Sequence, residues 1–107
     1  MKPFDYRALL SDKVMKERSR LLILSYLAAA GDGRAVFMRL QKALDLSRGN
    51  LSVQIQTLKD AGYVNVSKAF QDNKPRTTVS ITKEGVVALR KYLADMDKVI
   101  RSLGNDG

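Results

Sequence analysis

Apolar residues recur along the chain with two different periods. Between residues 11 and 30 they follow the 3.6-residue spacing of a helix and share one face: Val14, Leu21, Leu24 and Leu27. This stretch contains no Gly or Pro before Gly31. The Gly-Asp-Gly sequence that begins there can adopt the left-handed backbone conformation that ends a helix. The pattern predicts a helix over Ser11–Ala30.

Two shorter helical patterns follow, separated by a tight link at Asp45-Leu46. Phe37–Leu44 carries its apolar residues on one face and predicts a short helix. Ser47 is a good N-cap, and Leu51, Ile55 and Leu58 form the buried stripe expected of a helix over Ser47–Ala61, which Gly62 ends.

The period then changes from 3.6 to 2. Tyr63–Ser67 and Thr77–Ile81 alternate and are rich in β-branched residues, and the polar segment Gln71–Arg76 lies between them. Two such strands around one turn predict a β-hairpin. A short strand is also expected at Arg34–Val36, and Thr82 is expected to cap a last helix that runs from Lys83 to about Leu103.

The order of these elements predicts a mainly α fold with a small β-hairpin, arranged as a winged helix-turn-helix. The 107 residues suit one domain over 1–107, with a core at 11–85 and a C-terminal dimerisation helix at 86–103. We expect the N- and C-terminal helices to form a dimer interface.

Charge and composition narrow the range of functions expected of this chain. The formal net charge is +8, and all of it lies in the first 83 residues. Such an excess of Lys and Arg suits a polyanion, although it also occurs on surfaces that serve only solubility. There is no Cys and no His, so thiol chemistry and the commonest general base and metal ligand are absent. We therefore expect no enzyme activity, no metal and no cofactor.

The sequence pattern predicts no membrane span and no targeting signal. The most apolar stretch, Leu21–Ala30, is ten residues long and too short to span a bilayer. Asp5 and Arg7 interrupt any signal-peptide core near the N-terminus. We expect a cytoplasmic protein without a membrane partner.

Four segments carry a resemblance to a known family: Leu46–Ser52, Leu58–Val64, Lys74–Thr78 and Ile81–Gly85. In this order, the run from Arg20 to about Leu93 resembles the small, single-domain MarR/ArsR-like winged-helix transcriptional regulators. Gly62 and Gly85 match the family pattern, whereas Arg34–Phe37 matches it more loosely. The resemblance implies a DNA-binding regulator whose wing lies along phosphates or reaches the minor groove.

The helix that begins at Ser47 is the candidate reading helix, because the second helix of a helix-turn-helix enters the major groove. Opposite its buried stripe lies a face of mostly uncharged, hydrogen-bonding residues. Such groups suit base readout, whereas a merely solvated face is usually rich in Lys and Glu. The candidate DNA contacts on this helix are Ser47, Arg48, Asn50, Ser52, Val53, Gln54, Gln56 and Thr57.

The hairpin adds three basic candidates: Lys68 on its first strand, and Lys74 and Arg76 at its tip. Pro75 stiffens the tip, and Asp72 opposes the positive charge. Phosphate contact is the favoured interpretation, although any solvated turn carries polar residues.

The last helix has apolar residues spaced three and four apart, the seam of a coiled coil. The apolar residues of its first part suit packing on the core. Those of its later part extend past the domain and would be exposed in one chain, so a symmetric partner chain is the simplest way to bury them. The N-terminal residues Phe4, Tyr6, Leu9 and Leu10 are also apolar and have no evident place in the core. A homodimer built from both chain ends is therefore expected, and its candidate contacts are Leu9, Leu10, Leu89, Tyr92, Leu93, Met96, Val99, Ile100 and Leu103.

The leading hypothesis is therefore a dimeric, sequence-specific double-stranded DNA binder that represses transcription at an inverted-repeat operator. The alternative is a winged-helix protein–protein interaction module with incidental, non-specific DNA affinity, which salt would abolish. A small-molecule effector is compatible with either hypothesis, but no motif names one.

Overall fold

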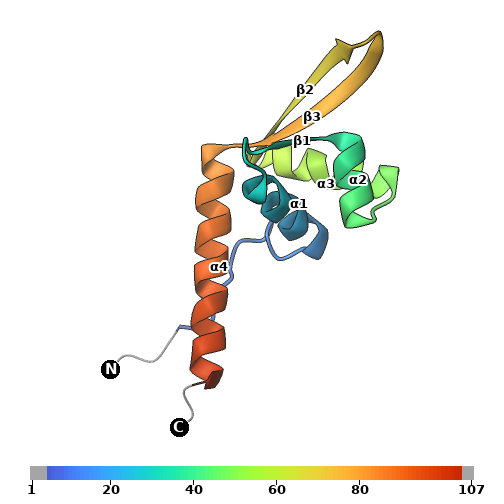
Figure 1. Cartoon of the computed structure of the whole chain (residues 1–107). Coiled ribbons are helices and arrows are strands. Elements are labelled where there is room, and N and C mark those ends of the chain that lie inside the picture. The colour runs from blue at the N-terminus through green and yellow to red at the C-terminus, as the bar shows by residue number, and fades with distance from the viewer. Residues whose placement is uncertain (1–4, 105–107) are drawn as a thin grey trace.

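The computed structural model describes residues 5–104. Within these residues, four helices and three strands form an elongated molecule of 61 × 26 × 23 Å (Figure 1). In chain order they are α1 (Arg18–Ala29), β1 (Arg34–Val36), α2 (Phe37–Leu44), α3 (Arg48–Asp60), β2 (Val64–Gln71), β3 (Lys74–Ile81) and α4 (Lys83–Gly104). The predicted winged helix-turn-helix is confirmed, with α2 and α3 as its two helices and the β2–β3 hairpin as its wing. No helix within residues 5–104 has the length and apolar character needed to cross a membrane.

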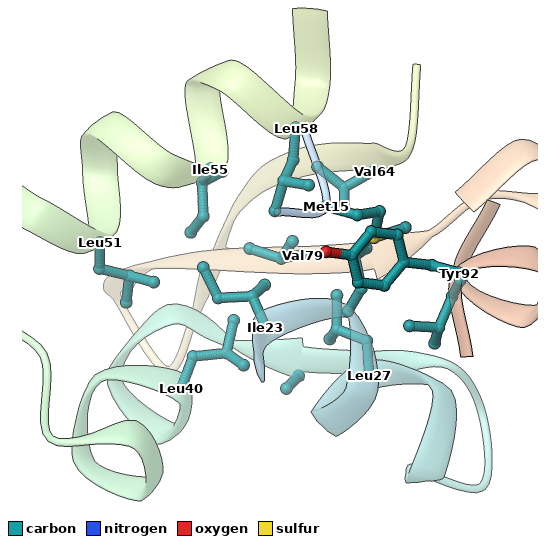
Figure 2. Packing of buried hydrophobic residues seen from close by; sticks show 13 residues of the cluster. Met15, Ile23, Leu27, Leu40, Leu51, Ile55, Leu58, Val64, Val79 and Tyr92 are labelled. Atoms are coloured by element: carbon teal, nitrogen blue, oxygen red, sulfur yellow. The ribbon is translucent and has the colours of Figure 1, made fainter. Parts of the chain in front are cut away.

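A single cluster of apolar side chains joins α1, α2, α3 and the sheet (Figure 2). The predicted stripe of α3, made of Leu51, Ile55 and Leu58, points into this cluster. Ile23 of α1 and Leu40 of α2 are fully buried in it. Each such side chain contributes about 1.5–3 kcal/mol through burial, so the core fixes how α3 sits on the domain.

The sheet has the order β1-β3-β2, and both pairings are antiparallel. β1 covers only part of β3, from Arg34 opposite Ser80 to Val36 opposite Thr78. β2 pairs with β3 along its whole length. Beyond Val36 the wing is therefore a two-stranded ribbon that projects from the domain (Figure 1).

The wing is longer than the sequence pattern predicts. Strands were expected at Tyr63–Ser67 and Thr77–Ile81 around a turn at Gln71–Arg76, whereas β2 and β3 continue until only Asp72 and Asn73 remain between them. Both turn residues have positive φ, 54° and 62°. Asp and Asn tolerate this left-handed backbone, which a two-residue hairpin turn requires.

The first predicted helix is also wrong at its start, because α1 begins at Arg18 and not at Ser11. The Asp12 carboxylate accepts hydrogen bonds from the backbone N–H groups of Val14 and Met15, at 2.8 and 3.2 Å. A second cap follows at Glu17, whose extended backbone and carboxylate bond to Arg20 N–H begin α1. Two successive caps thus divide one amphipathic stretch.

The described N-terminal residues 5–17 hold turns and no α-helix, so the expected N-terminal dimer helix is not formed there. Phe4 lies outside the described residues. This segment runs beside α4 (Figure 1), and the Leu10 N–H donates a 3.1 Å bond to Asp95 Oδ2. Leu10 also packs against the core, where a partner chain was expected to cover it.

The first half of α4 packs on the same core. Leu89 and Tyr92, which the sequence analysis placed at a dimer interface, are 4% and 8% exposed within one chain. They therefore belong to the core of their own domain. Met96 is half-buried against the cluster, and α4 then extends away from the domain (Figure 1).

A compact junction at Thr82 joins α3, the wing and α4. The Thr82 hydroxyl donates to the Gly62 carbonyl at 2.6 Å, and Thr82 N–H donates to the Tyr63 carbonyl at 3.0 Å. As the predicted N-cap of α4, the same hydroxyl accepts from Gly85 N–H at 2.9 Å. Gly85 is required here, because a Cβ would collide with the Tyr63 carbonyl oxygen.

Candidate nucleic-acid interface

The candidate reading helix α3 is fixed by its cap and by its buried stripe. Ser47 has extended backbone, and its hydroxyl accepts from Asn50 N–H at 3.1 Å, as predicted for an N-cap. The tight turn before it uses Asp45 in a left-handed conformation, with φ of 52°. With Leu51, Ile55 and Leu58 inside, the opposite face of α3 is directed to solvent.

The structure brings most of the predicted reading residues together on that outward face. The exposed ones are Ser47, Arg48, Asn50, Ser52, Val53 and Gln56, whereas Gln54 and Thr57 are half-buried. Val53 is 61% exposed, which leaves an apolar group available among polar ones. Arg48 is the only cation in this group of eight.

Gln54 holds a different position from the one expected of a base-contacting residue. Its Oε1 accepts a 2.8 Å bond from Arg20 Nη1 on α1, and its Nε2 donates to Asn50 Oδ1 at 3.0 Å. Arg20 is itself fixed by a 2.8 Å bond from Nε to the Val14 carbonyl. Gln54 thus links the N-terminal turn, α1 and the reading face.

This chain of bonds orients the Asn50 amide. Because Asn50 Oδ1 accepts from Gln54, its amino group is directed away from Gln54, and the oxygen still has a second lone pair. An Asn amide that offers one donor and one acceptor together matches the N7 and N6 edge of adenine. The sequence gives no local sign of the role of Arg20, because its partner Gln54 lies 34 residues away. The i, i+4 spacing of Asn50 and Gln54, in contrast, is visible in the sequence.

The other end of the reading face is ordered by local bonds. Gln56 Nε2 donates to Asp60 Oδ1 at 2.8 Å, and the Thr57 hydroxyl donates to the Val53 carbonyl at 3.2 Å. The Thr57 hydroxyl is therefore directed along its own helix. Gln56 keeps its amide oxygen and its other N–H for a ligand.

The three basic residues of the wing lie in strands, and they divide between its two faces. Lys68 follows Val64 and Val66 in alternation, on the face that continues from the core. Lys74 and Arg76 lie on the opposite face, in β3 and not in a turn. All three side chains are exposed.

A hollow of about 690 Å³ lies between the C-terminal end of α1, β1, the start of α2 and β3. Its lining includes three guanidinium groups, from Arg34, Arg39 and Arg76, and the carboxylate of Asp32. Asp32 pairs with Arg34 at 3.7 Å. The lining therefore carries net positive charge suited to a phosphate.

Sequence reasoning missed Arg34 and Arg39 as candidates. The antiparallel pairing of β1 with β3, which ends at Val36 opposite Thr78, brings β1 and the start of α2 beside Arg76. A non-local strand pairing of this kind leaves no local pattern in the sequence.

Two titratable groups outside the reading face tie the N-terminal segment to the domain. A hydrogen bond to Asp12 raises the pKa of Tyr63 to about 12, because losing the proton would leave two anions in contact. The bond from Lys91 and that from the Leu10 backbone hold the pKa of Asp95 below its usual range.

A helix-turn-helix with an outward polar face and an adjoining basic hairpin defines the class of a winged-helix DNA-binding protein. Residues 19–100 match the family model described as a winged helix DNA-binding domain, and the chain belongs to that family. The winged-helix, DNA-binding part of the predicted resemblance is thereby confirmed.

Relatives agree with this assignment. The transcriptional regulator homologue from Pyrococcus horikoshii OT3 is 32% identical, with a TM-score of 0.79 over 88% of this chain and 92% of that one. The MarR family regulator Sco3205 from Streptomyces coelicolor, solved in complex with DNA, shares the fold at 20% identity and a TM-score of 0.70, over 92% of this chain and 64% of that one. Protein MJ0432 from Methanocaldococcus jannaschii is 27% identical over 67 residues, which are 63% of this chain and 73% of that protein.

Proposed function

We propose that two copies of this chain bind an inverted repeat in double-stranded DNA and repress transcription there. Residues 1–107 act as one unit, in which 11–85 hold the DNA-binding surface and 86–103 the pairing helix. The observation that carries this proposal is the exposed, almost uncharged polar face of α3, opposite the buried Leu51, Ile55 and Leu58.

The chemistry of that face suits direct readout in the major groove. Arg48, in the first turn, can donate two hydrogen bonds to guanine, and the oriented Asn50 amide can pair with adenine. Val53, 61% exposed, can contact a thymine methyl group. The N-terminus of α3 also favours a phosphate, so the helix start would meet the edge of the groove.

Backbone contacts would come from the basic groups around α3. The first helix of a helix-turn-helix crosses the DNA backbone, and Arg39 lies on that helix, α2. Arg34 and Arg76 share the hollow with Arg39, so one phosphate can be held by several guanidiniums. Lys68 and Lys74 extend the positive charge along the wing.

Pairing of two chains is supported by the apolar stripe of α4. The stripe begins in the core at Leu89 and continues along the projecting half as Leu93, Ile100 and Leu103, which are 43%, 60% and 73% exposed. A two-fold partner that repeats the same surface would cover it. Two reading helices related in this way meet successive major grooves about 34–36 Å apart, which is why we propose an inverted repeat.

Repression would follow from occupancy of the promoter by the bound dimer. A dimer that fills two major grooves of a promoter would exclude other proteins from the same stretch of DNA.

The test is a titration of the purified protein against the duplex upstream of its own gene, with a scrambled duplex of equal length, at physiological salt. Specific regulators prefer their site by about a thousandfold or more. Arg48→Ala should remove that preference. Arg90→Ala is the control, because it removes the same charge from an exposed site on α4.

Selection of bound duplexes from a random pool with the wild-type protein would find an operator that does not lie upstream of its own gene. If neither the upstream duplex nor any enriched duplex is preferred, sequence-specific binding is wrong. A monomer mass in light scattering at micromolar concentration would overturn the pairing.

A further inference from the structure

The wing ends in an exposed aromatic side chain that the binding surface described above does not use. Phe70 is 79% exposed, although aromatic side chains are normally buried for their large apolar area. It stands directly opposite Pro75 in the β2–β3 register, two positions from the turn. The apolar tip of the wing, defined as Phe70 with Pro75, has no cover within the described chain.

The register shows which way this tip faces. Val64, Val66, Lys68 and Phe70 alternate onto one face of the hairpin, and Val64 at the base is buried in the core. Phe70 thus lies at the far end of the face that continues from the core. β1 stops beside Thr78, so this part of the wing is a projecting ribbon.

The hairpin is fully paired up to its tip. The ladder runs unbroken to Gln71 opposite Lys74, and a two-residue turn closes it. The Pro75 ring, opposite Phe70, restricts the backbone there. Such backbone restriction lowers the conformational freedom that is lost when the tip is inserted into a partner.

The charges around the tip indicate the partner. Lys68, Lys74 and Arg76 lie within a few positions of Phe70, against the single carboxylate of Asp72. A basic ribbon with one apolar point matches a DNA groove, where cations meet the two phosphate backbones and the apolar group meets the bases. Apolar wedges of this kind unstack base steps in the minor groove and kink the duplex.

We propose that Phe70 is such a wedge: it inserts from the minor groove at a base step beside the major groove that α3 reads, and it bends the duplex. This inference rests on the proposed DNA-binding function. Its consequence is a second source of specificity, because pyrimidine–purine steps unstack more easily than others. Specificity at the base step next to the α3 site would then depend on how easily the DNA deforms there, with no hydrogen bond to a base.

The experiment uses full-length protein and a duplex enriched from a random pool by the wild-type protein. Donor and acceptor dyes at its two ends report bending, and 2-aminopurine beside the flanking step reports unstacking. Phe70→Ala is compared with Met38→Ala, a matched control on α2 whose side chain is 78% exposed. Phe70→Leu tests rescue by another apolar wedge.

Wild-type protein and Met38→Ala should bend the duplex and brighten 2-aminopurine. Phe70→Ala should lose both signals and bind roughly tenfold more weakly, while the base preferences set by α3 remain. Phe70→Leu should restore part of the bend. Replacing the flexible flanking step by a stiff one should weaken the wild type and leave Phe70→Ala unchanged.

Equal bending by Phe70→Ala and wild type would overturn the wedge and leave the proposed function intact. The same holds if Phe70→Ala lowers the mass of the free protein in light scattering, since Phe70 would then be a contact between chains. If no duplex is enriched at all, the proposed function itself fails.

Discussion

The Tyr63 hydroxyl donates a 2.6 Å hydrogen bond to the Asp12 carboxylate across 51 residues of sequence. Tyr63 lies between α3 and β2, whereas Asp12 caps the turn that precedes α1. The bond therefore fastens the N-terminal segment to the base of the wing. It is also the main reason why the pKa of Tyr63 is about 12.

Replacing Asp12 by Asn should return the pKa of Tyr63 toward 10, since both the anionic acceptor and its charge are removed. In the wild type the stabilisation is complete below the unfolded pKa of about 10, and it is lost as the pH rises toward 12. A pH titration of tyrosinate absorbance measures the shift. Tyr63→Phe identifies the Tyr63 step among the four tyrosines, and an unchanged titration in Asp12→Asn would contradict the prediction.

Asp95 should make the protein sensitive to acid. Its lowered pKa means that its stabilisation is present above the ordinary Asp value and is lost as the pH falls through the lower folded value. Asp95→Asn should therefore reduce stability at neutral pH and flatten its decline in acid. Denaturant unfolding at several pH values measures both effects.

Asp97→Asn provides the control for Asp95→Asn on the same helix. Asp97 pairs with Arg101 at 2.8 Å, but both side chains are well exposed, so little change is expected. Equal effects of the two substitutions would show that the Leu10–Asp95 contact contributes nothing particular.

Two glycines should respond to Ala in opposite directions. At Gly85 the new methyl group meets the Tyr63 carbonyl oxygen, and the backbone shift should cost about 1–3 kcal/mol of unfolding free energy. At Gly49 in α3 nothing lies within 4 Å of the added Cβ, and the gain in helix propensity should be about 0.4–1 kcal/mol. Urea unfolding of both variants tests the contrast, which would fail if Gly85→Ala were neutral.

The reading face and the hollow should differ in their response to sequence and salt. Asn50→Ala should relax preference at one base pair, at a cost of about 1–3 kcal/mol. Arg76→Ala should weaken all duplexes alike and lower the salt slope of binding by about one. Binding isotherms at several salt concentrations separate the two. A loss of base preference in Arg76→Ala would place that residue among the reading groups.

The projecting half of α4 should control the oligomeric state. Ile100→Asp places a charge on the exposed apolar stripe and should give a monomer in light scattering. Val87→Asp is the matched control, since Val87 is 67% exposed on another face of α4. A dimer that persists in Ile100→Asp would exclude this stripe as the interface.

Much of the fold was predictable because its signals are local. Ser47 before Asn50, Thr82 before Gly85 and the stripe of α3 each depend on neighbours within one or two turns. The order of elements followed from these signals. The start of α1 did not, because the caps at Asp12 and Glu17 compete with a helical pattern that continues through them.

The candidate site was predictable only in part. The exposed residues of α3 follow from helix geometry, but the role of Gln54 depends on Arg20, and the arginine hollow depends on strand pairing. Leu89 and Tyr92 were misassigned because a stripe that enters a core has the same spacing as one that meets a partner. Only the tertiary structure separates these cases.

The Thr82 junction has a mechanical consequence. One hydroxyl links the segment that follows α3 to the first turn of α4, with the base of the wing between them, so we expect these elements to move together. In a pair of chains the angle of α4 would set the distance and the tilt of both DNA-reading elements together. A substitution that changes this angle would alter which half-site spacing is accepted, while the bases recognised within each half-site would stay the same.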